Sequence, residues 1–110
     1  MSNHLDVFTP DLGSTITVTI ASSSVAVSGN ILANRTQYTV YNSGADIVFV
    51  EFGAVATKPS GNTRGSYPIG PGVVQTIGVN LVGGALPTTV SVIGNSATSC
   101  VVYVSAGSGF

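Results

Sequence analysis

Apolar and polar residues alternate along several segments of this chain, which is the pattern of β-strands with one covered face. The clearest case is residues 14–21, STITVTIA, in which isoleucine or valine alternates with threonine. Residues 36–41 alternate in the same way, with Tyr38 and Val40 on one face. Both segments are therefore predicted to be half-buried strands, the first with a threonine-lined outer face.

The most informative stretch is residues 36–53, TQYTVYNSGADIVFVEFG, which predicts two strands joined by an Asn-Ser-Gly turn. Its second strand is apolar on both faces. The residues predicted to face the domain's own core are Val48, Val50 and Phe52. Ile47 and Phe49 then need other cover, either from a second layer of the same chain or from a neighbouring subunit.

Short strands and turns also account for the rest of the chain. Valine-rich strands are predicted at residues 73–79, 88–93 and 98–105, and a short strand from Val25 is expected to be broken by Ser28-Gly29-Asn30. The total, about seven or eight short strands, predicts an all-β chain that forms a single β-sandwich, either Ig-like or jelly-roll-like. Residues 1–13 are predicted to be an amino-terminal arm or edge strand, and residues 14–110 the sandwich domain.

One long segment, residues 54–66, has few large side chains and contains two of the three basic residues, Lys58 and Arg64. It is predicted to be an exposed loop that is either a contact loop or a solvated connector. The candidate interface residues of the chain come from this loop, from the two-faced strand and from the amino-terminal arm. They are Ile47, Phe49, Lys58, Arg64, Tyr67, Leu5 and Phe8.

Ionisable side chains are rare: the chain is 44% hydrophobic and 6% charged, with a net charge of −1. Charged residues usually make up roughly 25 to 35% of a small soluble protein's surface. Either other chains cover much of this surface, or uncharged Ser, Thr and Asn side chains keep it soluble. Without a basic cluster the chain is not expected to bind nucleic acid, and without a long apolar stretch or a basic leader it is not expected to enter a membrane.

The few reactive side chains do not form a catalytic or metal-binding pattern. His4 is the only histidine, and Asp46 and Glu51 fall on opposite faces of the predicted strand region. Cys100 is in phase with Val102 and is predicted to be a buried core residue of a protein made in a reducing cytoplasm. We therefore expect no enzyme activity, no catalytic residues, no metal and no cofactor.

Three segments carry a family resemblance: YTVYNSGADIVFVEFG, then YPIGPG before a valine-rich strand, then the ending CVVYVSAGSGF. Together they resemble a group of small structural proteins of tailed bacteriophages, in which these turns and strands recur in one order. The resemblance covers about residues 34–110 and is carried by turns and valines, not by catalytic residues. Residues 1–33 fall outside it.

The resemblance implies a β-sandwich virion protein that assembles in the host cytoplasm. The first expectation is a capsid decoration or cement protein, a homo-oligomer that binds the major capsid protein or other virion proteins and bridges capsid subunits. The alternative is a neck, tail or fibre module that contributes to tail assembly or binds a host-surface glycan or receptor. For such a module Tyr41, Tyr67 and Tyr103 are candidate sugar-stacking rings, although strand packing is the more common role of such tyrosines.

Overall fold

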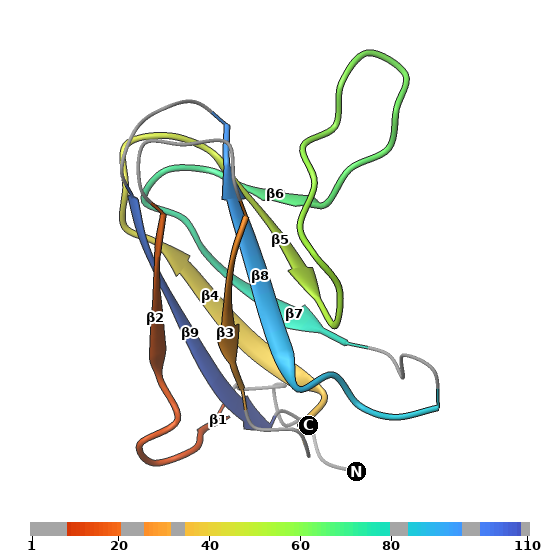
Figure 1. Ribbon diagram of the computed structural model, residues 1–110. Helices are drawn as coiled ribbons and strands as arrows, with labels where there is room; N and C mark the ends of the chain where they lie inside the picture. The colour runs from red at the N-terminus through yellow and green to blue at the C-terminus, as the bar shows by residue number, and fades with distance from the viewer. Residues whose placement is uncertain (1–8, 21–25, 32–34, 80–83, 96–99, 109–110) are drawn as a thin grey trace, which may run out of the picture.

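The computed structural model describes residues 9–20, 26–31, 35–79, 84–95 and 100–108, and the description below is of these residues (Figure 1). They form antiparallel β-strands joined by turns and loops, as the alternating pattern predicts. The strands are β1 (Thr9–Pro10), β2 (Ile16–Ile20), β3 (Val27–Asn30), β4 (Gln37–Asn42), β5 (Val48–Phe52), β6 (Tyr67–Ile69), β7 (Val74–Gly78), β8 (Thr89–Gly94) and β9 (Cys100–Ser108). The described residues contain no helix that is long and apolar enough to cross a lipid bilayer.

The strands form two sheets that face each other as a β-sandwich. In sheet A the order is β2-β9-β4-β7, and β1 pairs with the end of β9 beyond β2; in sheet B the order is β3-β8-β5-β6. From β2 onward every connection crosses to the opposite sheet except the one between β5 and β6. This is the strand order of a jelly roll, one of the two arrangements that the sequence left open.

The core lies between the sheets and is built from the alternating apolar positions. Val48 and Val50 are buried there and Phe52 is half-buried, so the predicted inward face of β5 is confirmed. Tyr38 of β4 is fully buried and stacks on Phe52, with ring centroids 5.0 Å apart, which links the two sheets. The rest of the buried core consists of Val18, Ile20, Val40, Ile69, Val90, Val92, Cys100, Val102, Val104 and Ala106.

The prediction that Ser28-Gly29-Asn30 breaks a strand is wrong. These residues continue β3 and pair with Thr89, Val90 and Ser91 of β8. A Cβ at Gly29 would lie 2.9 Å from Cδ1 of Ile16 in the facing sheet, a contact that a small shift of the end of the Ile16 side chain relieves. Gly29 thus lies inside a strand and not at a change of chain direction.

Cys100 is buried in the core, as predicted, and its Sγ donates a hydrogen bond to Oδ1 of Asn42 at 3.0 Å. Burial raises the pKa of the Cys100 thiol, while the backbone N–H of Gly44 opposes the rise. Since the thiolate is the reactive form, this cysteine is inert in the folded chain.

We therefore expect Cys100 to react with an aromatic disulfide reagent at mildly alkaline pH only at the rate at which the chain unfolds. Absorbance of the released thiol, followed with and without urea, measures this. Full reaction in urea is the positive control. Rapid stoichiometric labelling without urea would contradict the burial of the thiol.

Candidate functional site

The outer faces of the two sheets differ, and the face of sheet B is partly covered by the chain itself. After β5 the chain folds back over this sheet, where the backbone N–H of Ala56 donates to Oγ of Ser91 at 2.9 Å. Ala56, Phe49 and Ile93 form a small second cluster there, and Phe49 is only 7% exposed. Phe49 is thus covered within the chain, the first of the two alternatives, and does not belong to the exposed candidate surface.

Of the other predicted contact residues, four are exposed in the described part of the chain and two lie outside it. Ile47 is exposed just before β5, and Tyr67 is exposed on the edge strand β6. The loop between β5 and β6 projects from the sandwich (Figure 1), and its Lys58 Nζ donates to the backbone oxygen of Asn95 at 3.0 Å. Arg64 is exposed on the same loop. Leu5 and Phe8 lie outside the described residues.

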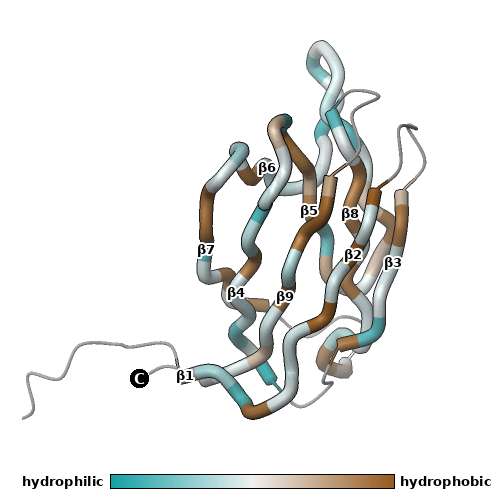
Figure 2. Tube along the Cα trace, turned by 90° about the vertical axis from the view of Figure 1, so that its left-hand side faces the viewer, coloured by the Kyte–Doolittle hydropathy of each residue, from teal (hydrophilic) through white to brown (hydrophobic). Residues whose placement is uncertain are grey.

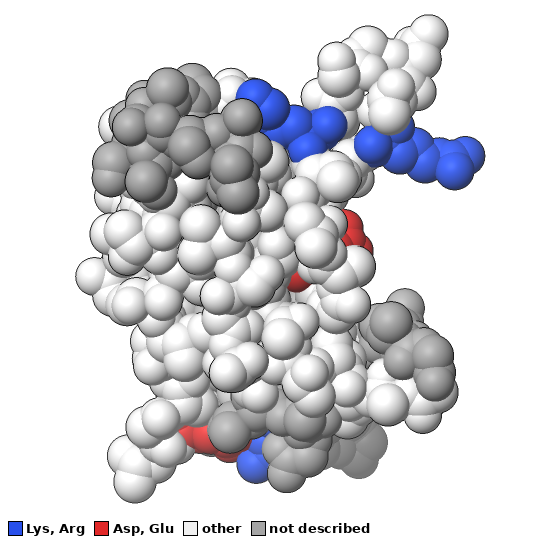
Figure 3. Space-filling model, in the orientation of Figure 1, with Lys and Arg blue, Asp and Glu red and all other residues white. Residues whose placement is uncertain are grey.

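Charged side chains are few on the visible surface: they gather at two ends, with one further acidic group part-way between them (Figure 3). Basic atoms lie beside the projecting loop, and a second charged group lies at the opposite end. There Arg35 Nε and Nη2 donate to the Asp11 carboxylate at 2.6 and 3.0 Å, which ties the segment after β1 to the start of β4. The Arg35–Asp11 pair is the one salt bridge recorded among the described residues.

The outer face of sheet A carries no Asp, Glu, Lys, Arg or His side chain in its described strands. Figure 2 shows β7, β4, β9 and β2 side by side in this sheet. The outward residues of the four strands are Thr17, Thr19, Gln37, Thr39, Tyr41, Val74, Thr76, Gly78, Val101, Tyr103, Ser105 and Gly107. We call this set the sheet A face.

One row of cross-strand partners runs over the middle of the sheet A face. Thr17 is paired with Tyr103, Tyr103 with Tyr41, and Tyr41 with Val74, one residue from each strand. The two tyrosine rings stack with centroids 5.9 Å apart, and both rings are exposed. Val74 beside them is 59% exposed. The row is therefore an apolar and aromatic centre.

Hydroxyl side chains surround this centre. In the adjoining row Thr15 Oγ1 and Ser105 Oγ are 2.7 Å apart and hydrogen-bonded, and Thr39 and Thr76 continue the row. Sequence reasoning identified the threonine-lined face of residues 14–21 but did not connect it with Tyr41, Tyr103 and Val74. The missing information was the register, because only the pairing of β2, β9, β4 and β7 places these residues side by side.

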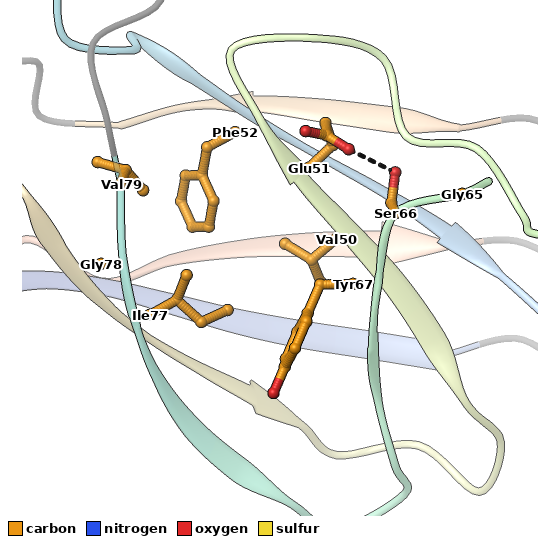
Figure 4. Close-up of a pocket in the computed structure, with 9 residues that line it drawn as sticks. All are labelled: Val50, Glu51, Phe52, Gly65, Ser66, Tyr67, Ile77, Gly78 and Val79. Carbon is orange, nitrogen blue, oxygen red and sulfur yellow. Dashed lines mark hydrogen bonds between the residues drawn. The ribbon is translucent and has the colours of Figure 1, made fainter.

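A second feature is a groove at the open edge of the sandwich, where β6 of sheet B and β7 of sheet A end the two sheets. It has a volume of about 310 Å³. The lining residues are Val50, Glu51, Phe52, Gly65, Ser66, Tyr67, Ile77, Gly78 and Val79. Figure 4 shows Phe52, Ile77 and Val79 on one side and Ser66 and Tyr67 on the other. The groove thus has apolar walls beside the exposed ring of Tyr67, while the Glu51 carboxylate and the Ser66 hydroxyl bond to each other on the opposite face of β5.

The described residues contain no group of three or more His, Cys, Asp or Glu side chains that could hold a metal ion. What the two surfaces offer is contact: a flat uncharged face and a small groove. No known protein family, curated protein or solved structure matches this chain.

Proposed function

We propose that the chain is a structural protein of a bacteriophage particle, a decoration or cement protein that packs against neighbouring virion subunits through the sheet A face. The observation that carries the proposal is this four-strand surface without a formal charge, centred on Tyr103, Tyr41 and Val74. The virion location itself rests on the resemblance of residues 34–110 to small phage structural proteins.

The physical case for a docking role depends on the contrast between the two sheets. Charged residues are depleted at the buried centre of protein interfaces, while aromatic residues are enriched there. Sheet B has its own cover, with Phe49 packed under Ala56, whereas the described residues place no second layer on the sheet A face. Tyrosine and threonine side chains suit such a contact, because they bury apolar area while their exposed hydroxyls can still hydrogen-bond. Oγ1 of Thr39 is the exception, since it is already buried without a partner among the described residues.

In a capsid such a contact stabilises the shell by removing apolar surface from water at the joints between subunits. A stable interface of standard size takes about 800 Å² from each partner. The projecting loop with Lys58 and Arg64 and the exposed Ile47 lie outside the sheet A face, so they remain free for contacts with other virion proteins and take no part in self-association. A symmetric oligomer that uses the same face on each copy is the simplest arrangement.

A charge placed on the sheet A face is expected to weaken association. Val74→Lys introduces an ammonium group at the centre of the covered surface, and we expect self-association at least about tenfold weaker than for the unaltered chain. Sedimentation velocity over a range of concentrations measures the effect.

The matched control is Val55→Lys, because Val55 is also an exposed valine, at 69%, but lies on the loop after β5. It is expected to associate as the unaltered chain does. If the unaltered chain remains a monomer at high concentration, or if both lysine variants behave alike, the sheet A face is not the self-association surface.

The virion location is tested with purified particles of the phage that encodes the chain. We expect the protein in a copy number comparable to that of the major capsid protein, and particles without it to release DNA at lower temperature or lower salt. A copy number that is a small fraction of the major capsid protein would point to the neck or tail. Absence of the protein from particles would refute the proposal.

A further inference from the structure

We propose that the open edge of β7 pairs with β7 of a second copy, which joins the A sheets of two chains into one continuous antiparallel sheet. β7 ends sheet A on one side: it pairs with β4, and no described strand pairs with its other edge. Figure 2 shows β7 as the outermost strand of this sheet. The proposal concerns the edge of sheet A rather than its face, and it does not depend on a virion location.

The backbone groups on the open edge of β7 follow from its pairing with β4. The N–H of Val79 donates to the backbone oxygen of Thr36 at 2.8 Å. The backbone oxygen of Val73 accepts from the N–H of Asn42 at 3.1 Å. Every second residue of an antiparallel strand bonds to the same neighbour, so the odd-numbered residues of β7 bond to β4. The residues whose N–H and C=O groups point to the open edge are therefore Val74, Thr76 and Gly78.

β7 lacks the features that keep an open strand edge from pairing. Such edges usually carry a charge, a proline or a bulge, or lie under another segment. The sequence of β7 is VQTIG, and its register with β4 is continuous from Val74 to Gly78, so it has neither charge, proline nor bulge. By contrast, β6 contains Pro68, and on the far side of the sandwich the Ile16 side chain of β2 reaches Gly29 of β3. β7 is thus open to a further strand.

The sequence of β7 is self-complementary in one antiparallel register. A two-fold axis through Thr76 places Thr76 opposite its own copy and Val74 opposite Gly78, so every N–H and C=O group on the open edge gains a partner. The larger side chain then lies opposite the residue without one, and threonine pairs favourably with threonine across strands. An axis through Gln75 would place Gly78 opposite Gly72, whose N–H is already bonded within the chain at 2.8 Å. Because β7 has no charged side chain, a second copy meets no electrostatic repulsion.

The groove beside β7 gives the second copy apolar surface to cover. The cross-strand partner of Tyr67 is the core-facing Val50, so the tyrosine lies on the inner side of sheet B, and its side chain is 52% exposed. Ile77 and Phe52 line the same groove and are half-buried (Figure 4). In the proposed register Gln75 of the second copy lies opposite Ile77, on the inner side of sheet A. The added strand therefore covers the mouth of the groove.

The first test uses NMR of the unaltered full chain over a range of concentrations. Pairing through β7 should slow hydrogen exchange of the Val74, Thr76 and Gly78 amides as the concentration rises. A mixture of isotope-labelled and unlabelled chain should also show a nuclear Overhauser effect between the α-protons of Gln75 and Ile77. Within one strand these two residues are about 7 Å apart, so the signal arises between copies.

The second test removes one hydrogen-bond donor at the centre of the contact. Thr76→Pro takes away an N–H that points away from β4, and proline is tolerated in an edge strand where the N–H side faces solvent. We expect dimerisation at least about tenfold weaker in sedimentation velocity, with an unchanged far-UV circular dichroism spectrum. Thr76→Val is the matched control, because it keeps the N–H and the side-chain shape and should dimerise as the unaltered chain does.

The edge contact is separable from the sheet A face. Val74→Lys leaves the β7 backbone unchanged and its side chain lies opposite Gly78, so this variant should keep the slowed amide exchange of β7 while it loses association through the face. The edge contact is refuted if the chain remains a monomer at millimolar concentration, if the amides of Val74, Thr76 and Gly78 exchange at rates independent of concentration, or if Thr76→Pro dimerises as Thr76→Val does. Should Thr76→Pro not fold, the amide exchange and the nuclear Overhauser effect of the unaltered chain decide.

Discussion

Replacing Asn42 with alanine is expected to lower the free energy of unfolding by about 3 kcal/mol or more. The side chain is fully buried at the end of β4 and makes four hydrogen bonds to three other parts of the chain. Nδ2 donates to the backbone oxygens of Asp46 at 2.7 Å and Ile69 at 3.0 Å. Oδ1 accepts from the backbone N–H of Gly44 and from Sγ of Cys100, both at 3.0 Å.

The size of the expected effect follows from what the truncation leaves behind. Alanine would leave polar groups without partners beneath the turn, and each such buried group costs about 1–3 kcal/mol. Asn42→Asp is a sharper test, because a carboxylate oxygen would replace the amide donor opposite two carbonyl oxygens. It should destabilise at least as much as alanine does, although it keeps the shape of the side chain.

Urea denaturation followed by circular dichroism measures both variants. Asn95→Ala is the control, since Asn95 is exposed and its recorded hydrogen bonds use backbone atoms. It should stay within about 0.5 kcal/mol of the unaltered chain. Midpoints of Asn42→Ala and Asn42→Asp close to that of Asn95→Ala would show that the Asn42 network does not hold the turn.

Asn42 also illustrates how far the sequence could predict this structure. The Asn-Ser-Gly turn and the existence of both adjoining strands were predicted correctly, because turn chemistry and strand periodicity are local properties of the chain. That the two strands form a hairpin is wrong, because β4 lies in sheet A and β5 in sheet B. The burial of Asn42 was not predictable in the same way. Its partners Ile69 and Cys100 are 27 and 58 residues away in sequence, and only the strand order brings them together.

The same limit applies to the candidate surfaces. Phe49 was assigned to a possible interface because its strand is apolar on both faces, yet the fold of the following loop supplies its cover through Ala56. The alternating threonines of residues 14–21 predicted one part of the sheet A face. Its tyrosine centre was not predictable, because it depends on the register of β9 with β4. The partner of Glu51, Ser66, lies across a loop whose path no local pattern specifies.

Replacing Gly44 with alanine is expected to destabilise the fold by about 2–3 kcal/mol through overpacking. Gly44 is not among the glycines with positive φ, so the cost does not come from the backbone conformation. It comes from space, because an added Cβ would lie 2.0 Å from Sγ and 2.9 Å from Cβ of Cys100. Gly70→Ala is the matched control: its Cβ would be 3.4 Å from Cγ2 of Val73, and the effect should be small.

A double-mutant cycle identifies the sulfur as the cause. Cys100→Ala alone removes a small buried side chain and its hydrogen bond to Asn42, so it should destabilise modestly. In the Gly44→Ala, Cys100→Ala chain the sulfur clash is gone, and the two changes should cost less together than their sum, by about 1–3 kcal/mol. Rescue should stay incomplete because the contact between the two Cβ atoms remains at 2.9 Å. Strictly additive losses in urea denaturation would mean that Gly44 is required for a reason other than the proximity of Cys100.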